Sequence, residues 1–480
     1  MRRATTFTAF ALISLFVVAA AAPALAEPSS LPPFIRDNLP GFSSSRLSNG
    51  IPVYIKQNAA NRVRNLSLVI LGGSLTADPG EAGWTKTALA TMARASSKYP
   101  YKTVVDLLDA TSSSISSSAQ FEYSTFSLNV LDKYFDRLFP VWADMIVAPS
   151  FAKSDFDQAQ SETLLAIQSK DEDPWAITGR VMNEAFFAGH PYAIVPDGTE
   201  ATVQAATPQA MDSWYASNIS ADRIFIVAVG DFEPDALVAS LNATLGSLPD
   251  RKLGKVRQPS DFFSKKPGGL IVENSDQSKG VAYIRGDFPA PAPGAPDYMA
   301  ANMAMKLYSD LLFTVVRDRY GAVYTPSAAV RSFGANYGSI SMYKTTKPES
   351  IKSYIDEAAS IFASGRCVSV DPSRPGEEAT FMKIPEALET YKRLYANAYF
   401  AAIRTNAAVA GLMIRSVVAS GDPADWLYDI QRIVAVTPEQ ISATFSTYVL
   451  KGPLTWVAVG DPKLLSKLDP TPFAGFNLGK

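Results

Sequence analysis

The sequence predicts an α+β protein made of two homologous, duplicated domains, each a mixed β-sheet covered by helices. Two motifs recur 230 residues apart: Thr-Pro-Gln at 207–209 matches Thr-Pro-Glu at 437–439, and Val-Ala-Val-Gly-Asp occurs at both 227–231 and 457–461. In each copy they indicate a helix, an apolar strand and then a Gly-Asp turn. The chain has 480 residues, 47% of them hydrophobic and 19% charged, which suits two or three domains with large cores.

The N-terminus has the pattern of a secretory signal peptide. Arg2 and Arg3 give a basic start, residues 7–22 are apolar, and Ala24-Leu25-Ala26 forms a small-x-small cleavage site. The apolar run is shorter than the roughly 20 residues of a membrane span, and an uncleaved anchor is the alternative. We expect residues 1–26 to be removed, residues 27–44 to form an extension, and the protein to be secreted into the bacterial periplasm.

The first domain is predicted at 45–250. Its expected elements are strands at 45–47, 51–55 and 66–71 and a helix at 84–97. Asn49-Gly50 predicts the turn between the first two strands, because both residues tolerate the positive φ angles of a tight hairpin. The helix is predicted from apolar residues that recur on one face, namely Trp84, Ala88, Leu89 and Met92.

The second domain is predicted at 270–475, after a linker at 251–269 that is rich in proline, glycine and basic residues. Its expected elements include a strand at 280–284 and a long helix at 298–319. Gly321 follows that helix, and a glycine just past the last turn is a typical helix end.

The residue inventory excludes several kinds of site. His190 and Cys367 are the only histidine and the only cysteine, so the chain lacks an ordinary set of zinc ligands and has no intrachain disulfide. A Cys-His nucleophilic pair would need these two residues to meet. The mature chain is mildly acidic, which gives no electrostatic reason to expect nucleic-acid binding. No later stretch is long and apolar enough for a membrane span.

The order of the motifs resembles the pitrilysin/insulinase-type zinc metallopeptidases (inverzincins), in their processing-peptidase-like branch. The resemblance covers nearly the whole mature chain, and it implies two homologous α+β domains packed as half of a clamshell. The stretches that carry it are Leu47-Ser48-Asn49-Gly50, Gly72-Gly73-Ser74, the helix opening at Gly83, Asp173-Pro174, His190-Pro191-Tyr192, Gly198-Thr199 and the two Val-Ala-Val-Gly-Asp runs.

The resemblance also implies that the first domain has lost its zinc site. Active members carry His-x-x-Glu-His on the first long helix and a further glutamate about 76 residues on. The corresponding positions here are Lys86, Leu89 and Ala90, and the distal position falls at Ala166 or Ile167. We therefore expect no metal and no other cofactor in this chain. Lys86 itself has the simpler interpretation of an exposed or snorkelling helix lysine.

The second domain keeps a different feature of the family. Members carry an arginine and a tyrosine seven residues apart, and here Arg317 and Tyr324 stand at that spacing around Gly321. Because the helix ends at Gly321, the two side chains can converge, and both can donate hydrogen bonds to a peptide carbonyl. The alternative is structural: an arginine complements the helix dipole, as Arg319 would equally, and a tyrosine commonly begins a strand.

Other candidate residues have simpler interpretations. His190 is expected to be a packed loop histidine, Cys367 a thiol without an activator, and residues 171–174 a surface turn at a helix end. The serine run at 112–118 predicts a strand with a solvated or peptide-facing edge. In the resembled family a strand here pairs with the substrate backbone. A serine nucleophile with Lys86 or Lys133 as base is the alternative.

These observations favour a non-catalytic subunit that contributes Arg317 and Tyr324 to the active site of a homologous subunit. That partner would carry His-x-x-Glu-His and Zn²⁺, and the substrate would be a peptide. The alternative is a catalytically inactive scaffold or peptide-binding protein of the cell envelope. An independent enzyme with different chemistry is the third hypothesis.

Overall fold

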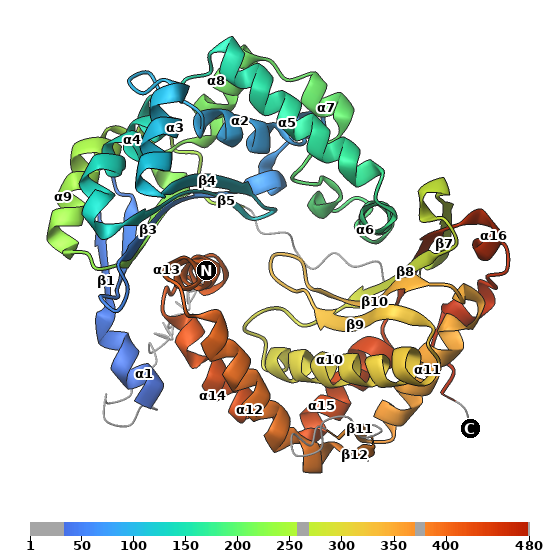
Figure 1. Ribbon diagram of the computed structural model, residues 1–480. Coiled ribbons are helices and arrows are strands. Elements are labelled where there is room, and N and C mark those ends of the chain that lie inside the picture. The colour runs from blue at the N-terminus through green and yellow to red at the C-terminus, as the bar shows by residue number, and fades with distance from the viewer. Residues whose placement is uncertain (1–32, 257–267, 370–379, 479–480) are drawn as a thin grey trace, which may run out of the picture.

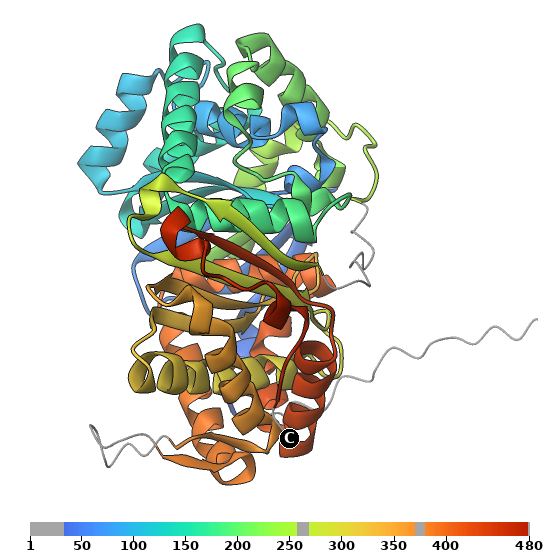
Figure 2. The same cartoon turned by 90° about the vertical axis from the view of Figure 1, so that its right-hand side faces the viewer.

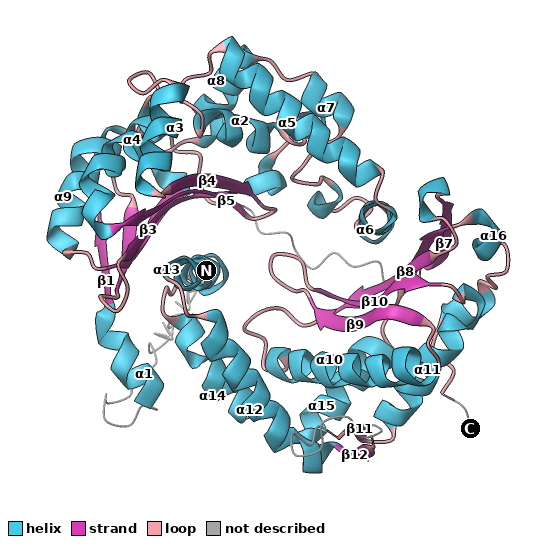
Figure 3. Cartoon of the chain, in the orientation of Figure 1, coloured by secondary structure: helices cyan, strands magenta, loops and turns pink. Residues whose placement is uncertain are grey.

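The computed structural model describes residues 33–256, 268–369 and 380–478. The predicted signal peptide at 1–26 lies outside these ranges, as do parts of the predicted extension and linker. Two large β-sheets, a two-stranded hairpin and the surrounding helices make up the described chain (Figures 1 and 3).

The first sheet has six strands in the order β1-β2-β6-β3-β5-β4. Strands β2 and β6 are parallel, and the other neighbours are antiparallel. The Asn49-Gly50 turn joins β1 to β2, as predicted, with the Gly50 N–H donating to the Leu47 carbonyl. The strands are β1 (Phe42–Arg46), β2 (Pro52–Gln57), β3 (Val63–Leu71), β4 (Ser114–Ala119), β5 (Tyr123–Leu131) and β6 (Ile224–Gly230).

The second sheet repeats this arrangement without a counterpart of β1. Its order is β7-β13-β8-β10-β9, in which β7 and β13 are parallel and the other neighbours antiparallel. Strands β6 and β13 therefore hold the same place in the two sheets, and both contain the repeated Val-Ala-Val-Gly run. The strands are β7 (Gly269–Asn274), β8 (Ala282–Pro289), β9 (Val323–Val330), β10 (Tyr337–Thr345) and β13 (Thr455–Gly460).

The helix before each repeated strand is capped in the same way. Thr207 accepts a hydrogen bond from the Ala210 N–H at the start of α8 (Pro208–Asn218). Thr437 accepts one from the Gln440 N–H at the start of α15 (Pro438–Thr444). Side-chain caps of this kind satisfy the free N–H groups of the first turn. Strand order and caps together confirm the predicted duplication of an α+β fold.

Helices cover the outer face of each sheet (Figures 1 and 2). Those over the first sheet are α2 (Trp84–Met92), α3 (Tyr101–Thr111), α4 (Phe135–Val147), α5 (Lys153–Asp171), α7 (Glu200–Gln204), α8 and α9 (Pro234–Thr244). Those over or beside the second are α10 (Tyr298–Leu312), α11 (Pro348–Ala363), α12 (Ile384–Ala402), α14 (Asp429–Val434), α15 and α16 (Pro462–Leu465). A short hairpin of β11 (Arg366–Val368) and β12 (Phe381–Lys383) lies beside α12.

The inner face of each sheet is covered by a helix from the other half of the chain. Helix α13 (Asn406–Ser420) lies against β3 and β6, where Met413 and Ile414 pack on Val69 and Val227. Helix α6 (Pro174–Phe186) lies against β8 and β13, where Met182 packs with core residues of the second sheet. The short helix α1 (Pro33–Asn38) joins the cluster around α13 through Ile35. The two halves are thus interlocked by an exchange of helices.

Three predicted elements differ from the structure. The helix predicted at 84–97 is α2, which ends at Met92, and the strand predicted at 280–284 is β8. That strand runs on through Gly286 to Pro289, and the ring of Trp456 packs over Gly286 where a side chain would be: a Cβ there would lie 2.6 Å from the ring. The helix predicted at 298–319 consists of α10 and then a π-helix at Phe313–Arg319.

No single helix in the described ranges combines the length and apolar character of a membrane span. Helices α12 and α13 meet that criterion only when taken together, and they are bent by 111° relative to each other.

Candidate functional site

The positions predicted to have lost the zinc ligands lie on α2 and α5. Leu89 is buried in the first core, and Ala90 lines a cavity beside Lys86. The Lys86 Nζ donates to Asp197 Oδ1 at 2.6 Å, and Lys170 contacts the other oxygen of the same carboxylate. Lys86, predicted to be an exposed or snorkelling helix lysine, has a side chain that is 33% exposed, and its ammonium group forms an ion pair that the sequence did not predict.

Close packing at the start of α2 brings Asp197 to Lys86. Gly83 has a φ of +84° and touches the 197–198 loop, so that a Cβ at Gly83 would lie 2.6 Å from the Asp197 carbonyl oxygen. Burial alone would raise the pKa of Asp197. Hydrogen bonds from Lys170 and Lys86, with their charges, instead hold the pKa below its usual value.

The chemistry of this group does not fit a zinc ion. Zinc takes lone pairs from imidazole, thiolate or carboxylate groups, whereas the four positions offer an ammonium, an isobutyl group and two methyl groups. Glu162, one turn from Ala166 on α5, is drawn to Arg94 at 3.4 Å. In the described ranges no three His, Cys, Asp or Glu side chains are arranged to hold a metal. The positive charge of Lys86 thus stands where the resemblance would place the metal ion.

A cavity of about 540 Å³ adjoins this ion-paired group. Residues 117–121 line it, together with Lys86 and Asp197. Strand β4 contains residues 114–118 of the serine run predicted as a strand at 112–118, whose first two residues lie outside it. It ends the first sheet, and within the described chain only β5 pairs with it. An unpaired strand edge along a cavity is the geometry by which a sheet can accept an extended peptide.

The structure brings Arg317 and Tyr324 together at the junction of the π-helix and β9. The Arg317 guanidinium carbon lies 5.4 Å from the centre of the Tyr324 ring and 4.6 Å from that of Phe313. Tyr324, the second residue of the edge strand β9, is 64% exposed. Gly321, with a φ of +55°, donates its N–H to the Arg317 carbonyl and turns the chain into the strand. The two residues that were predicted to converge therefore lie close together, while their use in a reaction stays a prediction.

Arg319 is placed differently from Arg317. It contacts the carboxylate of Glu357, which also accepts a hydrogen bond from the Tyr320 hydroxyl at 2.6 Å. In the described part of the chain, no carboxylate lies within 4 Å of Arg317. Of the two arginines, Arg317 is therefore the one whose charge is available to another molecule. Short π-helices such as this one are often found at functional sites.

The remaining candidates are structural. The His190 ring is buried, its Nδ1 accepts the Tyr192 N–H at 3.0 Å, and burial lowers its pKa. Burial raises the pKa of the Cys367 thiol to about 11, so the thiolate is disfavoured. Asp173 caps α6 directly after α5 ends, which confirms the predicted surface turn. Sequence reasoning missed Asp197 and Lys170, because nothing in the local pattern shows that they meet Lys86.

Two family models match the chain. The model described as "Insulinase (Peptidase family M16)" matches residues 52–195, and the one described as "Peptidase M16 inactive domain" matches residues 205–364. The two matches together span most of the first domain and the start of the second.

Individual relatives are distant but similar along long stretches. An uncharacterized zinc protease of Mycobacterium leprae is 21% identical over 268 residues, which are 54% of this chain and 59% of that protein. The alpha subunit of the mitochondrial-processing peptidase of Solanum tuberosum is 21% identical over 45% of this chain and 42% of its own. The chain thus matches about three fifths or less of the length of these relatives.

A similar fold is known from Pseudomonas fluorescens. The crystal structure of a peptidase M16 inactive domain from that organism covers 88% of this chain and 98% of its own, with a TM-score of 0.73 and 17% identity.

Proposed function

Because this chain belongs to the M16 (insulinase) family of peptidases, we propose that it is the non-catalytic, substrate-binding subunit of a heterodimeric, secreted zinc metallopeptidase. The described residues form a peptidase-like scaffold of two sheets and the helices that cover them. The partner would be a homologous chain that carries His-x-x-Glu-His and Zn²⁺. This chain would supply Arg317 and Tyr324 to the partner's site for peptide hydrolysis.

One contrast between the two halves carries the proposal. In the first half, the positions of the zinc ligands are taken by Lys86 and by apolar residues, and Lys86 is neutralised by Asp197. In the second half, Arg317 and Tyr324 lie side by side, and among the residues that the structure describes neither is paired with a carboxylate. A chain that had lost all peptidase function would have no need of an exposed, adjacent pair of donors.

The chemistry expected of the pair follows from its atoms. A peptide carbonyl oxygen gains negative charge as the carbonyl carbon becomes tetrahedral. The Tyr324 hydroxyl can donate a hydrogen bond to that oxygen, and the Arg317 guanidinium can donate to a neighbouring backbone carbonyl. The apolar and small-residue pattern of residues 1–26 supports export to the periplasm as the place where the pair would work.

The test is coexpression of this chain with a homologue from the same organism that carries the intact motif. Zinc content and peptide cleavage are measured for each chain alone and for the mixture. We expect zinc in the partner, none bound stoichiometrically by this chain, and cleavage that requires both. Stoichiometric zinc in this chain, or full activity of the partner alone, would refute the proposal.

The second candidate is a scaffold or peptide-binding protein of the cell envelope. The unpaired edge of β4 beside a cavity favours peptide binding without hydrolysis. The same experiment separates the two functions, because a scaffold would assemble or bind peptide without changing the cleavage rate of any partner.

A further inference from the structure

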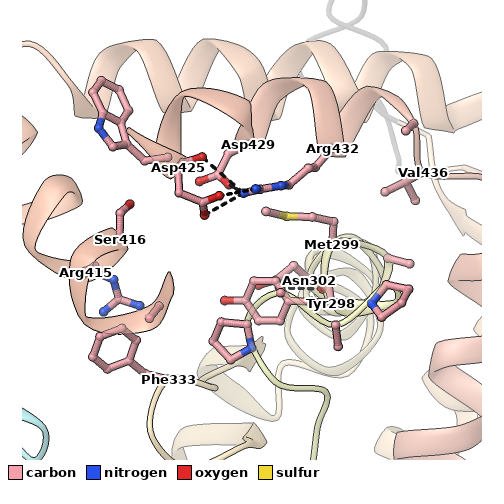
Figure 4. Close-up of a pocket in the computed structure, with 18 of the residues that line it drawn as sticks. Tyr298, Met299, Asn302, Phe333, Arg415, Ser416, Asp425, Asp429, Arg432 and Val436 are labelled. Atoms are coloured by element: carbon pink, nitrogen blue, oxygen red, sulfur yellow. Dashed lines mark hydrogen bonds and ion pairs between the residues drawn. The ribbon is translucent and has the colours of Figure 1, made fainter. Parts of the chain in front are cut away.

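A second cavity lies wholly within the second half of the chain, between α10, α13 and α14 (Figure 4). Its volume is about 420 Å³, which is within the usual range of small-molecule sites. It shares no lining residue with the cavity at Lys86, and it includes neither Arg317 nor Tyr324.

One wall of this cavity is basic. Arg415, on α13, stacks on the ring of Phe333, with the guanidinium carbon 4.4 Å from the ring centre. In the part of the chain that the structure describes, no carboxylate lies within 4 Å of it. Stacking fixes the plane of the guanidinium and leaves its N–H groups free for a planar, negatively charged group.

A second donor faces the same space. Tyr298, the first residue of α10, lines the cavity, and its hydroxyl points toward the side on which Arg415 lies (Figure 4). Its backbone carbonyl accepts a hydrogen bond from the Asn302 side chain at 2.8 Å, which holds the first turn of the helix in place. Arg415 and Tyr298 together can bind a carboxylate.

The opposite wall is acidic. Asp425 and Asp429 both accept hydrogen bonds from Arg432, and the bond to Asp429 Oδ1 is 3.1 Å long. Within the described ranges the second oxygen of Asp429 accepts no hydrogen bond. Burial raises the pKa of Asp429 to about 6 in spite of Arg432. A cation from a ligand would compensate this carboxylate better than the single hydrogen bond does.

We propose that this cavity binds a small zwitterion, a free amino acid or a dipeptide. The ligand carboxylate is held by Arg415 and Tyr298, and its ammonium group by Asp429. Met299, Val436 and Trp426 add apolar surface to the lining, which suits an aliphatic side chain. The charges of Arg415, Arg432, Asp425 and Asp429 sum to zero. The wall with Arg415 is positive and the wall with the other three is negative, which matches a ligand that carries one charge of each sign. The site stands independently of the proposed subunit function.

The test is isothermal titration calorimetry on the signal-free protein with three dipeptide probes: alanyl-leucine, its C-terminal amide and its N-acetyl form. Leucine tests whether a free amino acid binds in place of a dipeptide, and 4-methylpentanoate tests whether a carboxylate alone binds without an ammonium group. We expect alanyl-leucine or leucine to bind, and the amide, the acetylated form and 4-methylpentanoate to bind at least tenfold more weakly. No binding of either zwitterion at millimolar concentration, or equal binding of a probe that lacks one charge, overturns the proposal.

Variants locate the binding. Arg415→Met is expected to raise the Kd by about tenfold to a hundredfold, because a hydrogen-bonded charge is lost. Arg404→Met is the matched control, since Arg404 is an exposed arginine just before α13 that does not line the cavity, and it should leave the Kd unchanged. An unchanged Kd in Arg415→Met overturns the assignment. The comparison of probes on the unaltered protein decides the case if this variant fails to fold.

Discussion

The carboxylate of Glu122 accepts a hydrogen bond from the backbone N–H of Gly334 at 3.1 Å. Glu122 lies between β4 and β5, and Gly334 lies between β9 and β10, so the contact joins the equivalent turns of the two halves. The missing side chain of Gly334 permits this approach, because a Cβ at residue 334 would lie 2.2 Å from Glu122 Oε1 and would displace the glutamate side chain. A titratable group thus sits at the point where the halves touch.

This contact predicts a pH dependence of stability. Burial raises the pKa of Glu122 to about 7, against the N–H of Gly334 and the charge of Arg415, which both lower it. The folded state therefore favours the neutral acid, and Glu122 stabilises the protein most below pH 4.5. Its contribution declines as the pH rises to about 7. Glu122→Gln should remove this decline, which corresponds to a difference on the order of 3 kcal/mol between pH 4.5 and pH 8.

Chemical unfolding of the variant and the unaltered protein across this pH range gives the measurement. Glu81→Gln is the control, because Glu81 is an exposed carboxylate. Parallel stability curves for Glu122→Gln and the unaltered protein would contradict the expectation.

Tyr324→Phe is expected to lower the turnover of the assembled pair by on the order of 10²–10³, with assembly unchanged. Loss of one donor to a developing oxyanion costs about 3–4 kcal/mol of barrier. Steady-state kinetics with a fluorogenic peptide and size-exclusion chromatography give the two readouts. Tyr320→Phe is the matched control, since its hydroxyl is engaged by Glu357. Full turnover with Tyr324→Phe would exclude a catalytic contribution.

The two arginines of the π-helix should have opposite effects. Arg317→Ala should lower kcat/KM of the pair at least tenfold and change the unfolding midpoint little, because no carboxylate of the described residues pairs with its charge. Arg319→Ala should leave kcat/KM unchanged and cost up to about 1 kcal/mol of stability, the value of a partly exposed ion pair. Equal kinetic effects of the two substitutions would show that Arg317 has no special role.

Asn406→Ala is expected to destabilise the whole chain by about 2–4 kcal/mol. Asn406 is buried at the start of α13, donates to the Asn61 side chain at 3.0 Å and to the Val63 carbonyl, and accepts from Asn58 at 2.6 Å. Its removal leaves the half-buried side chains of Asn58 and Asn61 and the Val63 carbonyl of the other half without this partner. Urea denaturation measures the effect. Asn218→Ala, which loses one local hydrogen bond, should cost about 1 kcal/mol or less.

The fold class could be predicted because duplication leaves a record in the order of residues. The repeated threonine motif and the Val-Ala-Val-Gly-Asp run lie in equivalent helices and strands, and the Asn49-Gly50 turn is decided by two adjacent residues. The close placement of Arg317 and Tyr324 could also be predicted, because seven residues and one glycine determine it locally.

Long-range contacts could not be predicted in this way. Lys86 contacts Asp197 only because Gly83 and Gly198 let the 197–198 loop approach the start of α2, and no local sequence pattern encodes that approach. The end of α2 at Met92 and the π-helix after Leu312 depend on packing rather than on apolar periodicity. The cavity at Arg415 likewise joins residues from three helices that are far apart in sequence.

The crossing of α6 and α13 has a consequence for how this polypeptide can be divided. A fragment that ended near residue 250 would keep its own sheet but lose α13, and the strip around Val69 and Val227 would face water. Such a piece would self-associate or capture the missing helix from another copy. The chain therefore cannot be cut at the boundary between the halves into two independently folding domains. Experiments on either half alone would measure its self-association rather than its function.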